Sequence, residues 1–396
     1  MPVTERKPFA IVAKGSGISL SLDALNTKSH YFARILKAYG MDVTILSSIH
    51  YRAGPAARAV GRYRGIKYFM PSVHPASTSR LKRVFFKAAY IAKAIGFLLH
   101  MRRKSPRVHL IFDDNSIPLF PFLACLERMG VVELVFNIEE WPLAHDLPRA
   151  SRVRAHSFIS RALKASAKVV CVSTYLVERA REYNPQAKVF KLPALTDFDQ
   201  VTRSDPQARA SDPTRFLFCG SVAYAEVIDA IITAYESVSR SEDGYAMQLV
   251  LVLHGDAHEL SRISGRAAES AFPICMMTAL SEQALHEEYS NASVLLAPLR
   301  LTEQDEARFP QKIAEYAALG RPIITTYVGE PRQYFMPDES AIFMNDFSVS
   351  GLAEKMRFAV HNREKIVAIG MNGNAVGRKH FDYRGYVTSL GEFVTS

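Results

Sequence analysis

The sequence has few cysteines and no recognisable metal-ligand pattern. Its four cysteines are scattered, without a CxxC pair and without a histidine or cysteine at metal-ligand spacing: Cys125, Cys171, Cys219 and Cys275. We therefore expect reduced core cysteines, and neither a disulfide framework nor a cysteine-based metal site. The first residues, MPVTERKPFAIVAKG, lack the apolar region and cleavage site of a signal peptide, which favours a cytosolic protein.

Acidic residues are missing from one long stretch of the chain. None lies between Asp42 and Asp113, a stretch that holds 14 Lys and Arg residues. Residues 1–200 carry 31 Lys and Arg against 14 Asp and Glu, whereas residues 201–396 carry 18 against 25. This asymmetry predicts that the first half faces a polyanion, which can be nucleic acid, an anionic membrane or a phosphorylated substrate.

The length and the element pattern indicate two α/β domains. A chain of 396 residues, 48% of them hydrophobic, exceeds what a single core usually serves. Short apolar runs alternate with segments of helical period in both halves, which predicts parallel sheets with ligands beyond the carboxyl ends of their strands. The expected division is an amino-terminal domain, a polar linker, a carboxy-terminal domain and a final helix crossing back to the first domain: 1–200, 201–213, 214–377 and 378–396.

The stretch EARFPQKIAEYAALGRPIITT, residues 306–326, is the strongest candidate for a ligand site. Pro310 suits the first position of a helix, whose free N–H groups and dipole favour an anion. Lys312 adds a positive charge for phosphate, and Glu315, one turn later, could accept both hydroxyls of a ribose. The alternative is an ordinary Lys–Glu ion pair on a solvated helix.

This stretch resembles the donor-site motif of a known family. RFPQKIAEYAALGRPIITTYVGEP is similar to the motif of retaining GT-B glycosyltransferases of glycosyltransferase family 4 (group 1). FLFCGSVAYAEVIDAIITAYESV, LVLVLHGD and ALSEQALHEEYSNASVLLAPLR resemble the preceding segments of the family's second domain, and SGISLSLDALNTKSHYFARILKAYGMDVTILSS its first βαβ unit. The resemblance implies an α/β GT-B fold, in which two Rossmann-like domains with parallel sheets face a central cleft.

The resemblance also implies roles for individual residues. Glu315 would bind the ribose of a nucleotide-sugar donor, and Lys312 would meet its diphosphate, with Arg308 nearby. At the other donor-side positions the backbone would approach the phosphates or the base: Gly220, Ser221, Gly15, Ser16, Gly17, Ala279 and Leu280.

Two positions depart from the family pattern. Many members carry a second Glu eight residues before the ribose-binding one, where this chain has Ala307, with Asp305 and Glu306 as the nearest acids. Many also carry an Arg and a Lys just after the strand that ends at Gly220, where this chain reads GSVAYAEVID. We therefore expect Arg308 and Lys312 to neutralise more of the phosphate charge.

In the first domain, NIEEWPLAHDLP follows a predicted strand. Glu139, Glu140 and His145 are candidates for contacting the acceptor or taking the proton of its hydroxyl group. The alternative is that the two glutamates are simply solvated. Asp113–Asp114 does not have DxD spacing, and the family generally needs no metal ion, so we expect neither a metal nor another cofactor.

The basic stretch RLKRVFFKAAYIAKAIGFLLHMRRKSPR, residues 80–107, favours a helix that lies on an anionic membrane. Its most apolar part, AAYIAKAIGFLL, is shorter than the roughly 20 residues that span a bilayer. A core helix with an exposed basic rim is the alternative, whereas no nucleic-acid motif is recognisable and no such partner is expected. The candidate membrane or acceptor residues are Lys82, Arg83, Lys87, Arg102, Arg103 and Lys104.

Together these features predict a retaining hexosyltransferase at the cytoplasmic face of the membrane. It would transfer a sugar from a nucleotide-sugar to a lipid-linked or glycan acceptor, in surface polysaccharide biosynthesis. A non-catalytic scaffold of the same fold and a nucleotide-sugar epimerase remain as alternatives.

Overall fold

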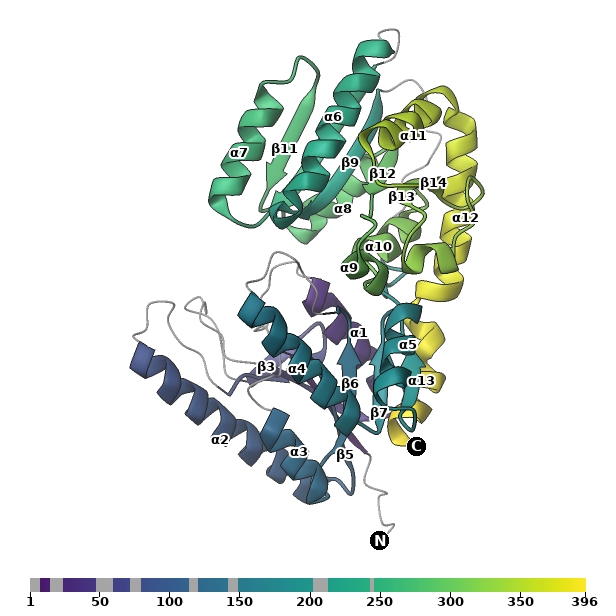
Figure 1. Ribbon diagram of the computed structural model, residues 1–396. Coiled ribbons are helices and arrows are strands. Elements are labelled where there is room, and N and C mark those ends of the chain that lie inside the picture. Colours follow the sequence, from purple (N-terminus) through teal and green to yellow (C-terminus); the bar gives the residue numbers. More distant parts are fainter. Residues whose placement is uncertain are drawn as a thin grey trace. The chain divides into compact units, whose positions relative to one another are not determined.

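The computed structural model describes residues 8–14, 24–47, 60–71, 80–113, 120–141, 149–201, 213–242 and 246–396. It divides the chain into two compact units (Figure 1). Unit 1 comprises Met1–Pro193 and Tyr383–Ser396, and unit 2 comprises Ala194–Asp382. The predicted bounds place the division at 201–213, of which 202–212 lie outside the described residues, whereas the units divide at Pro193.

Unit 1 is built on a sheet that is parallel except at one edge. Its strands are β1 (Phe9–Lys14), β2 (Asp42–Ser47), β3 (Val60–Tyr63), β4 (Ile66–Phe69), β5 (Val108–Phe112), β6 (Glu133–Ile138), β7 (Lys168–Cys171) and β8 (Lys188–Lys191). They are arranged in the order β3-β4-β2-β1-β5-β6-β7-β8. All residues of β5 and β7 are buried, as expected for central parallel strands covered on both faces.

The sequence analysis did not predict the antiparallel edge of this sheet. β3 and β4 form a hairpin in which Tyr63 pairs with Ile66. The two turn residues, Arg64 and Gly65, both have positive φ, at 48° and 79°. Such a two-residue turn matches the twist of the strands, but Arg-Gly is a weaker turn signal than Asn-Gly or Asp-Gly.

The helices of unit 1 are α1 (Ala24–Ala38), α2 (Arg80–Lys104), α3 (Phe120–Arg128), α4 (Arg149–Ala165), α5 (Thr174–Tyr183), η4 (Tyr383–Tyr386) and α13 (Val387–Thr395). The cysteines are free, as expected, but Cys125 is exposed on α3 rather than buried in the core. The buried face of this short helix is formed by Leu123 and Leu126 instead.

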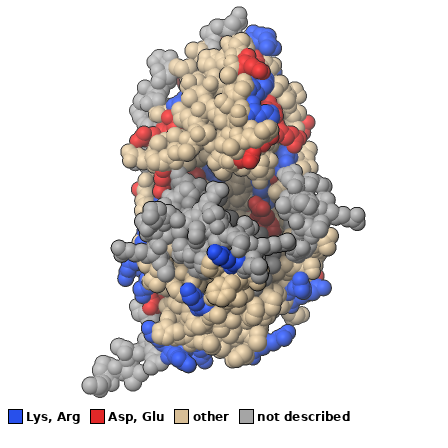
Figure 2. Space-filling model, turned by 90° about the vertical axis from the view of Figure 1, so that its left-hand side faces the viewer, with Lys and Arg blue, Asp and Glu red and all other residues tan. Residues whose placement is uncertain are grey.

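Helix α2 packs on unit 1 through one stripe only. Tyr90, Ala94 and Leu98 are buried at a spacing of four residues, while Val84 and Phe85 are 65% and 70% exposed. By length and composition, Val84–Lys104 could cross a membrane, in contrast to the expectation from its shorter apolar centre, and 24% of the segment is buried. In Figure 2 the visible face of unit 1 shows uncharged surface bordered mainly by Lys and Arg.

Unit 2 is built on a second, entirely parallel sheet. Its strands are β9 (Thr214–Ser221), β10 (Met247–His254), β11 (Ile274–Thr278), β12 (Val294–Ala297), β13 (Ile323–Thr326) and β14 (Ile342–Met344), in the order β11-β10-β9-β12-β13-β14. Its helices are η2 (Val222–Tyr224), α6 (Ala225–Ser241), α7 (Ala257–Ala268), α8 (Glu282–Asn291), α9 (Glu303–Ala307), α10 (Gln311–Leu319), η3 (Glu330–Gln333), α11 (Val349–His361) and α12 (Arg363–Phe381).

One face of this sheet carries a continuous apolar core. Ile231 and Tyr235 of α6, Ile263 of α7 and Met356 of α11 are buried there against residues such as Leu251 of β10. α10 packs separately, against α12, α8 and the strands β12 and β13. The buried strands β12 and β13 therefore support α10.

The carboxy-terminal segment returns to unit 1, where α13 packs against α1. A Cβ at Gly391 would lie 2.2 Å from the ring of Tyr39, so only glycine allows this close approach. Arg34 of α1 donates a hydrogen bond to the Tyr383 hydroxyl at 2.7 Å, with its guanidinium 4.1 Å from the centre of that ring.

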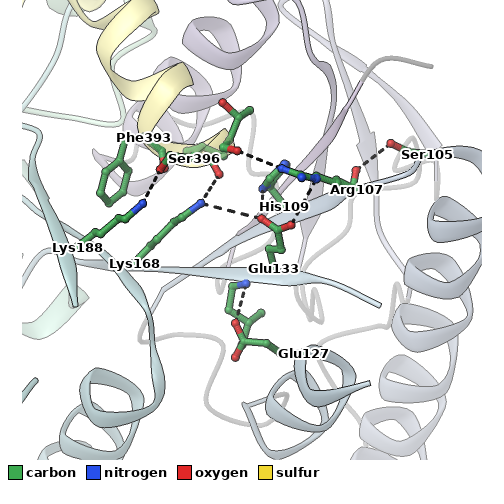
Figure 3. A network of polar contacts seen from close by, with 12 residues as sticks. Ser105, Arg107, His109, Glu127, Glu133, Lys168, Lys188, Phe393 and Ser396 are labelled. Carbon is green, nitrogen blue, oxygen red and sulfur yellow. Dashed lines mark hydrogen bonds and ion pairs between the residues drawn. The ribbon is translucent and has the colours of Figure 1, made fainter. Parts of the chain in front are cut away.

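A polar network fixes the end of α13 at the amino-terminal ends of strands β5, β6 and β7 (Figure 3). Lys168 Nζ donates to the carbonyl oxygen of Val394 at 2.8 Å and lies 4.0 Å from Glu133. His109 Nδ1 lies 3.2 Å from the same carboxylate, and the His109 side chain is fully buried. Burial lowers the pKa of His109 to about 4, because it disfavours the imidazolium; Glu133 opposes this shift, and Lys168 and Arg107 add to it.

This shift predicts acid sensitivity. The pKa of His109 in the folded protein lies below the ordinary value of about 6.5. The neutral, buried imidazole therefore contributes its full stabilisation above pH 6.5, and this contribution is lost as the pH falls towards 4. We expect His109→Gln to reduce the pH dependence of the free energy of unfolding over this interval by about 3 kcal/mol. Urea unfolding at several pH values, followed by circular dichroism, measures it. His258→Gln, at a side chain that is 87% exposed, is the control, and an unchanged dependence in His109→Gln would contradict the assignment.

Candidate donor site

The candidate site lies at the carboxyl ends of the strands in unit 2. The strand order of this sheet reverses between β9 and β12, which are neighbours although α6, α7 and α8 lie between them in the sequence. In doubly wound sheets such a reversal opens the crevice in which ligands bind. The segments that follow these two strands therefore form the walls of the site.

Lys312 reaches from α10 to the end of β9. Its Nζ donates a hydrogen bond to the carbonyl oxygen of Cys219 and lies 4.4 Å from the ring centre of Phe218. A Cβ at Gly220 would come within 2.8 Å of the Phe218 ring and 3.3 Å of Lys312 Nζ. A side chain at position 220 would thus displace the ammonium group, which explains the glycine at this strand end.

The helix begins one residue later than the sequence suggests. Pro310 is the N-cap, with φ −61° and ψ 126°, and α10 starts at Gln311. The prediction that Pro310 is the first helical residue is therefore wrong, because its extended ψ leaves it outside the helix. α10 ends at Gly320, whose φ of 71° forms a left-handed C-cap.

Glu315 and Lys312 do not form the ion pair of a solvated helix. Lys312 bonds to Cys219 instead, and both residues are half-buried. Burial lowers the pKa of Lys312 to about 8 and raises the pKa of Glu315 to about 7, because desolvation disfavours both charges. A hydrogen bond from Gln311 and the charge of Lys312 pull the Glu315 pKa down, while Glu282 pushes it up. Both groups are therefore poised to change protonation near neutral pH.

Arg308 belongs to a second cluster beside Lys312. Its Nη2 lies 2.6 Å from Oδ1 of the fully buried Asp305, and its Nη1 donates to the Tyr224 hydroxyl. Arg300, in the loop after β12, also binds Asp305, through Nε at 2.9 Å. The sequence analysis missed Arg300 and Tyr224. The pattern Thr302-x-x-Asp305 is a helix-start signal that could have located α9, since Thr302 Oγ1 accepts from Asp305 N.

No carboxylate takes the place of the missing family Glu. Ala307 is fully buried, and Glu306 is occupied by the Gly329 N–H, at 2.9 Å, and by Arg332. The two nearest acids, Asp305 and Glu306, are thus held by other groups of the protein.

The loop predicted to hold the base follows β11. Ala279 has a φ of 54°, in the left-handed region that residues other than glycine rarely adopt. Ser281, two residues later, caps α8 by accepting from Ala284 N at 3.1 Å. This cap and the strand fix Leu280 and Ala279 in a defined backbone conformation. At the end of β9, Ser221 likewise caps η2, accepting from Ala223 N at 3.2 Å.

The other candidate residues lie in unit 1 or outside the described residues. Glu139 is half-buried, with Lys28 Nζ at 3.3 Å and Asn137 Nδ2 at 2.7 Å, whereas Glu140 is exposed. Lys28 was not predicted. Gly15, Ser16, Gly17 and His145 lie outside the described residues, as do the side chains of Arg83 and Lys87.

The remaining residues of the basic stretch are exposed: Lys82, Arg102, Arg103 and Lys104. Arg102 donates to the carbonyl oxygens of Gly130 and Ser105, both at 3.3 Å, whereas Arg103 and Lys104 extend the basic end of α2. Over the described residues, no group of three or more His, Cys, Asp or Glu could hold a metal ion.

Comparison with known proteins identifies a matching family and solved structures of the same fold. Residues 213–362 match the model of the family described as "Glycosyl transferases group 1". No curated protein matches the sequence. Among solved structures, sucrose-phosphate synthase from Thermosynechococcus elongatus has a TM-score of 0.78 at 16% identity, with 98% of each chain covered.

Two further solved structures share the fold at low identity. HepE of Anabaena in complex with UDP-glucose has a TM-score of 0.67 at 11% identity, with 98% of each chain covered. The UDP-forming α,α-trehalose-phosphate synthase from Burkholderia vietnamiensis has a TM-score of 0.68 at 12% identity, covering 99% of this chain and 97% of that one.

The raised pKa of Glu315 predicts a stability effect. A folded pKa of about 7, above the ordinary value near 4.5, means that the charged carboxylate destabilises the fold above pH 7, and that this cost is absent below pH 4.5. We expect Glu315→Gln to raise the free energy of unfolding by up to about 3 kcal/mol at pH 8 and to change it little at pH 4.5.

Chemical denaturation at the two pH values measures this difference. Glu287→Gln, at an exposed position on α8, is the matched control and should show no such pH-dependent gain. Equal effects of Glu315→Gln at both pH values would show that the carboxylate is solvated.

The resemblance to group 1 glycosyltransferases is thus confirmed over residues 213–362, and the chain as a whole has the GT-B fold of two α/β domains with parallel sheets.

Proposed function

We propose that the protein is a retaining glycosyltransferase of family 4, which transfers a hexose from a nucleoside-diphosphate sugar to an acceptor hydroxyl. The observation that carries this proposal is the hydrogen bond from Lys312 to the Cys219 carbonyl oxygen, beside Gly220 at the end of β9. Lys312 lies one helical turn from Glu315. The family match over residues 213–362 supports the reaction class. Solved structures of the same fold with UDP or UDP-glucose make a UDP-sugar the first donor to test.

The site chemistry suits a diphosphate leaving group. As the bond between the sugar and the diphosphate breaks, negative charge develops on the diphosphate. The Lys312 ammonium and the amino end of α10 would place positive charge beside it. Glu315 would accept the two ribose hydroxyls as a carboxylate. Hydrogen bonds from the two ribose hydroxyls favour the charged carboxylate. Binding of the nucleotide-sugar should therefore lower the Glu315 pKa and release a proton near pH 7.

These cations also make a metal unnecessary in our proposal. Lys312 and Arg308 would neutralise the diphosphate, a task that a divalent cation performs in other transferases. In unit 1, Glu139 would contact the acceptor or take its proton, and Lys28, with Nζ 3.3 Å away, would orient this carboxylate. Glu140 and His145 remain candidates for the same task.

Donor binding can be tested by thermal shift with UDP, GDP and ADP sugars. A ligand that binds only the native state raises the melting temperature. We expect one nucleotide-sugar to stabilise the protein, and Glu315→Ala to weaken its binding by about 100-fold, since two hydrogen bonds to a charged group are lost at roughly 1.5 kcal/mol each.

Glu287→Ala, on the exposed face of α8, controls for loss of charge alone. Full binding by Glu315→Ala would sink the assignment of the donor site.

We further propose that α2 holds the protein on the cytoplasmic face of an anionic membrane, close to a lipid-linked acceptor of surface polysaccharide synthesis. Its exposed apolar residues Val84, Phe85 and Leu99 would enter the headgroup region. The basic end at Arg102, Arg103 and Lys104 would add about 1 kcal/mol per charge. The low buried fraction of the helix supports this proposal over a core helix.

Liposome co-sedimentation tests the membrane surface. Replacement of Arg102, Arg103 and Lys104 by Glu should abolish binding to vesicles containing anionic lipid, and 0.5 M salt should weaken the wild-type interaction, because screening reduces surface attraction. Arg262→Glu, a single charge reversal on a helix of unit 2, serves as a control for charge reversal away from α2. Undiminished binding by the triple variant would exclude this patch.

A second candidate function is a scaffold that binds the donor without turnover. The fully buried Ala307 and the absence of a basic pair after Gly220 favour it. Donor binding without transfer to any acceptor would support the scaffold, whereas conversion of the donor without an acceptor into another sugar would indicate an epimerase.

A further inference from the structure

Two arginines converge at the point where the strand order of unit 2 reverses. Arg300 lies in the loop after β12, and Arg308 lies between α9 and α10. Both approach Tyr224, which ends the short helix after β9. β9 and β12 are adjacent in the sheet, so the three residues meet directly beyond the carboxyl ends of two neighbouring strands.

One buried carboxylate holds both guanidinium groups. Asp305 Oδ2 accepts from Arg300 N at 2.8 Å and from Arg300 Nε at 2.9 Å, while Oδ1 lies 2.6 Å from Arg308 Nη2. The side chain of Asp305 is 1% exposed, and those of both arginines are 15% exposed. Two positive charges against one negative charge leave an excess of +1 in a partly dehydrated place.

The Tyr224 ring orients the same groups. The guanidinium carbons of Arg308 and Arg300 lie 4.6 Å and 5.3 Å from its centre. Arg308 also donates to the Tyr224 hydroxyl. Glu226 is the other acid near the cluster, 4.0 Å from Arg300 and 73% exposed, so water screens it.

The cluster lies beside the lysine of the donor site. The charges of Arg308 and Asp305 both influence the Lys312 pKa, in opposite directions. Tyr224 follows the strand end where related sequences carry an Arg and a Lys. In this chain the corresponding positive charge comes instead from the neighbouring loop and from the segment before α10.

We propose that Arg300 joins Arg308 and Lys312 in binding the diphosphate, and that Asp305 and Tyr224 position the two arginines for this contact. The ligand class is a nucleoside diphosphate or its sugar ester, and the inference rests on the function proposed above. Arg300 and Arg308 contact the phosphate oxygens, and Asp305 and Tyr224 are positioning residues. A bound diphosphate would neutralise the excess charge of the cluster.

Isothermal titration with UDP, uridine and inorganic pyrophosphate tests this site. We expect Arg300→Gln and Arg308→Gln each to weaken UDP and pyrophosphate binding about tenfold and to leave uridine binding unchanged. Each should also reduce the salt dependence of UDP binding. Arg300→Lys and Arg308→Lys should restore part of the affinity, because they keep the charge without the two-pronged geometry.

The positioning residues are tested by the same titrations. Tyr224→Phe keeps the ring and removes the hydroxyl contact, and should weaken UDP binding less than Arg308→Gln. Asp305→Asn should weaken it through misplaced arginines; if this variant fails to fold, the Tyr224 and arginine variants still decide. Arg332→Gln, which breaks an ion pair with Glu306 in the same region, is the control and should bind as the wild type does.

The outcomes separate this inference from the proposed function. UDP and pyrophosphate binding that is unchanged in both arginine-to-glutamine variants, or absent in the wild type, overturns the inference even if the enzyme transfers sugar. Pyrophosphate binding that depends on the two arginines, in a protein that turns over no nucleotide-sugar, supports the inference and overturns the proposed function.

Discussion

The contact of the Lys312 ammonium with the end of β9 is the one on which the rest of the candidate donor site depends. It requires a residue without a side chain at Gly220, an aromatic ring at Phe218 and a helix that begins beside the strand end. A charge in so dry a place is costly, as the lowered pKa of Lys312 and the raised pKa of Glu315 indicate. Ionisable groups with such shifted pKa values are typical of functional sites.

The architecture of unit 2 makes this arrangement rigid. The buried strands β12 and β13 support α10 from below, and Asn374 of α12 donates to the carbonyl oxygens of Ala317 and Ala318 at the other end of the helix. Asp305 then ties Arg300 and Arg308 to the same platform. Positive charge is thus distributed over three side chains from different segments, which suits a diphosphate better than a single phosphate.

Unit 1 is organised differently. At the amino-terminal ends of its strands, Lys168 holds the end of α13 by donating to Val394, and Glu133 links Lys168 to His109. Its long helix α2 exposes apolar and basic side chains together. Exposure of the apolar side chains to water is unfavourable unless another surface covers them.

The sequence was sufficient to predict the α/β class, most strands and the motif around Lys312 and Glu315, because apolar runs, glycine stops and i,i+3 spacing are local properties. It could not locate the β3–β4 hairpin, whose Arg-Gly turn is a weak signal, or the N-cap role of Pro310. Nor could it pair Arg308 with Tyr224, 84 positions away, or join Arg300 to both. Those contacts depend on long-range packing, because they arise when β9 and β12 become neighbours in the sheet.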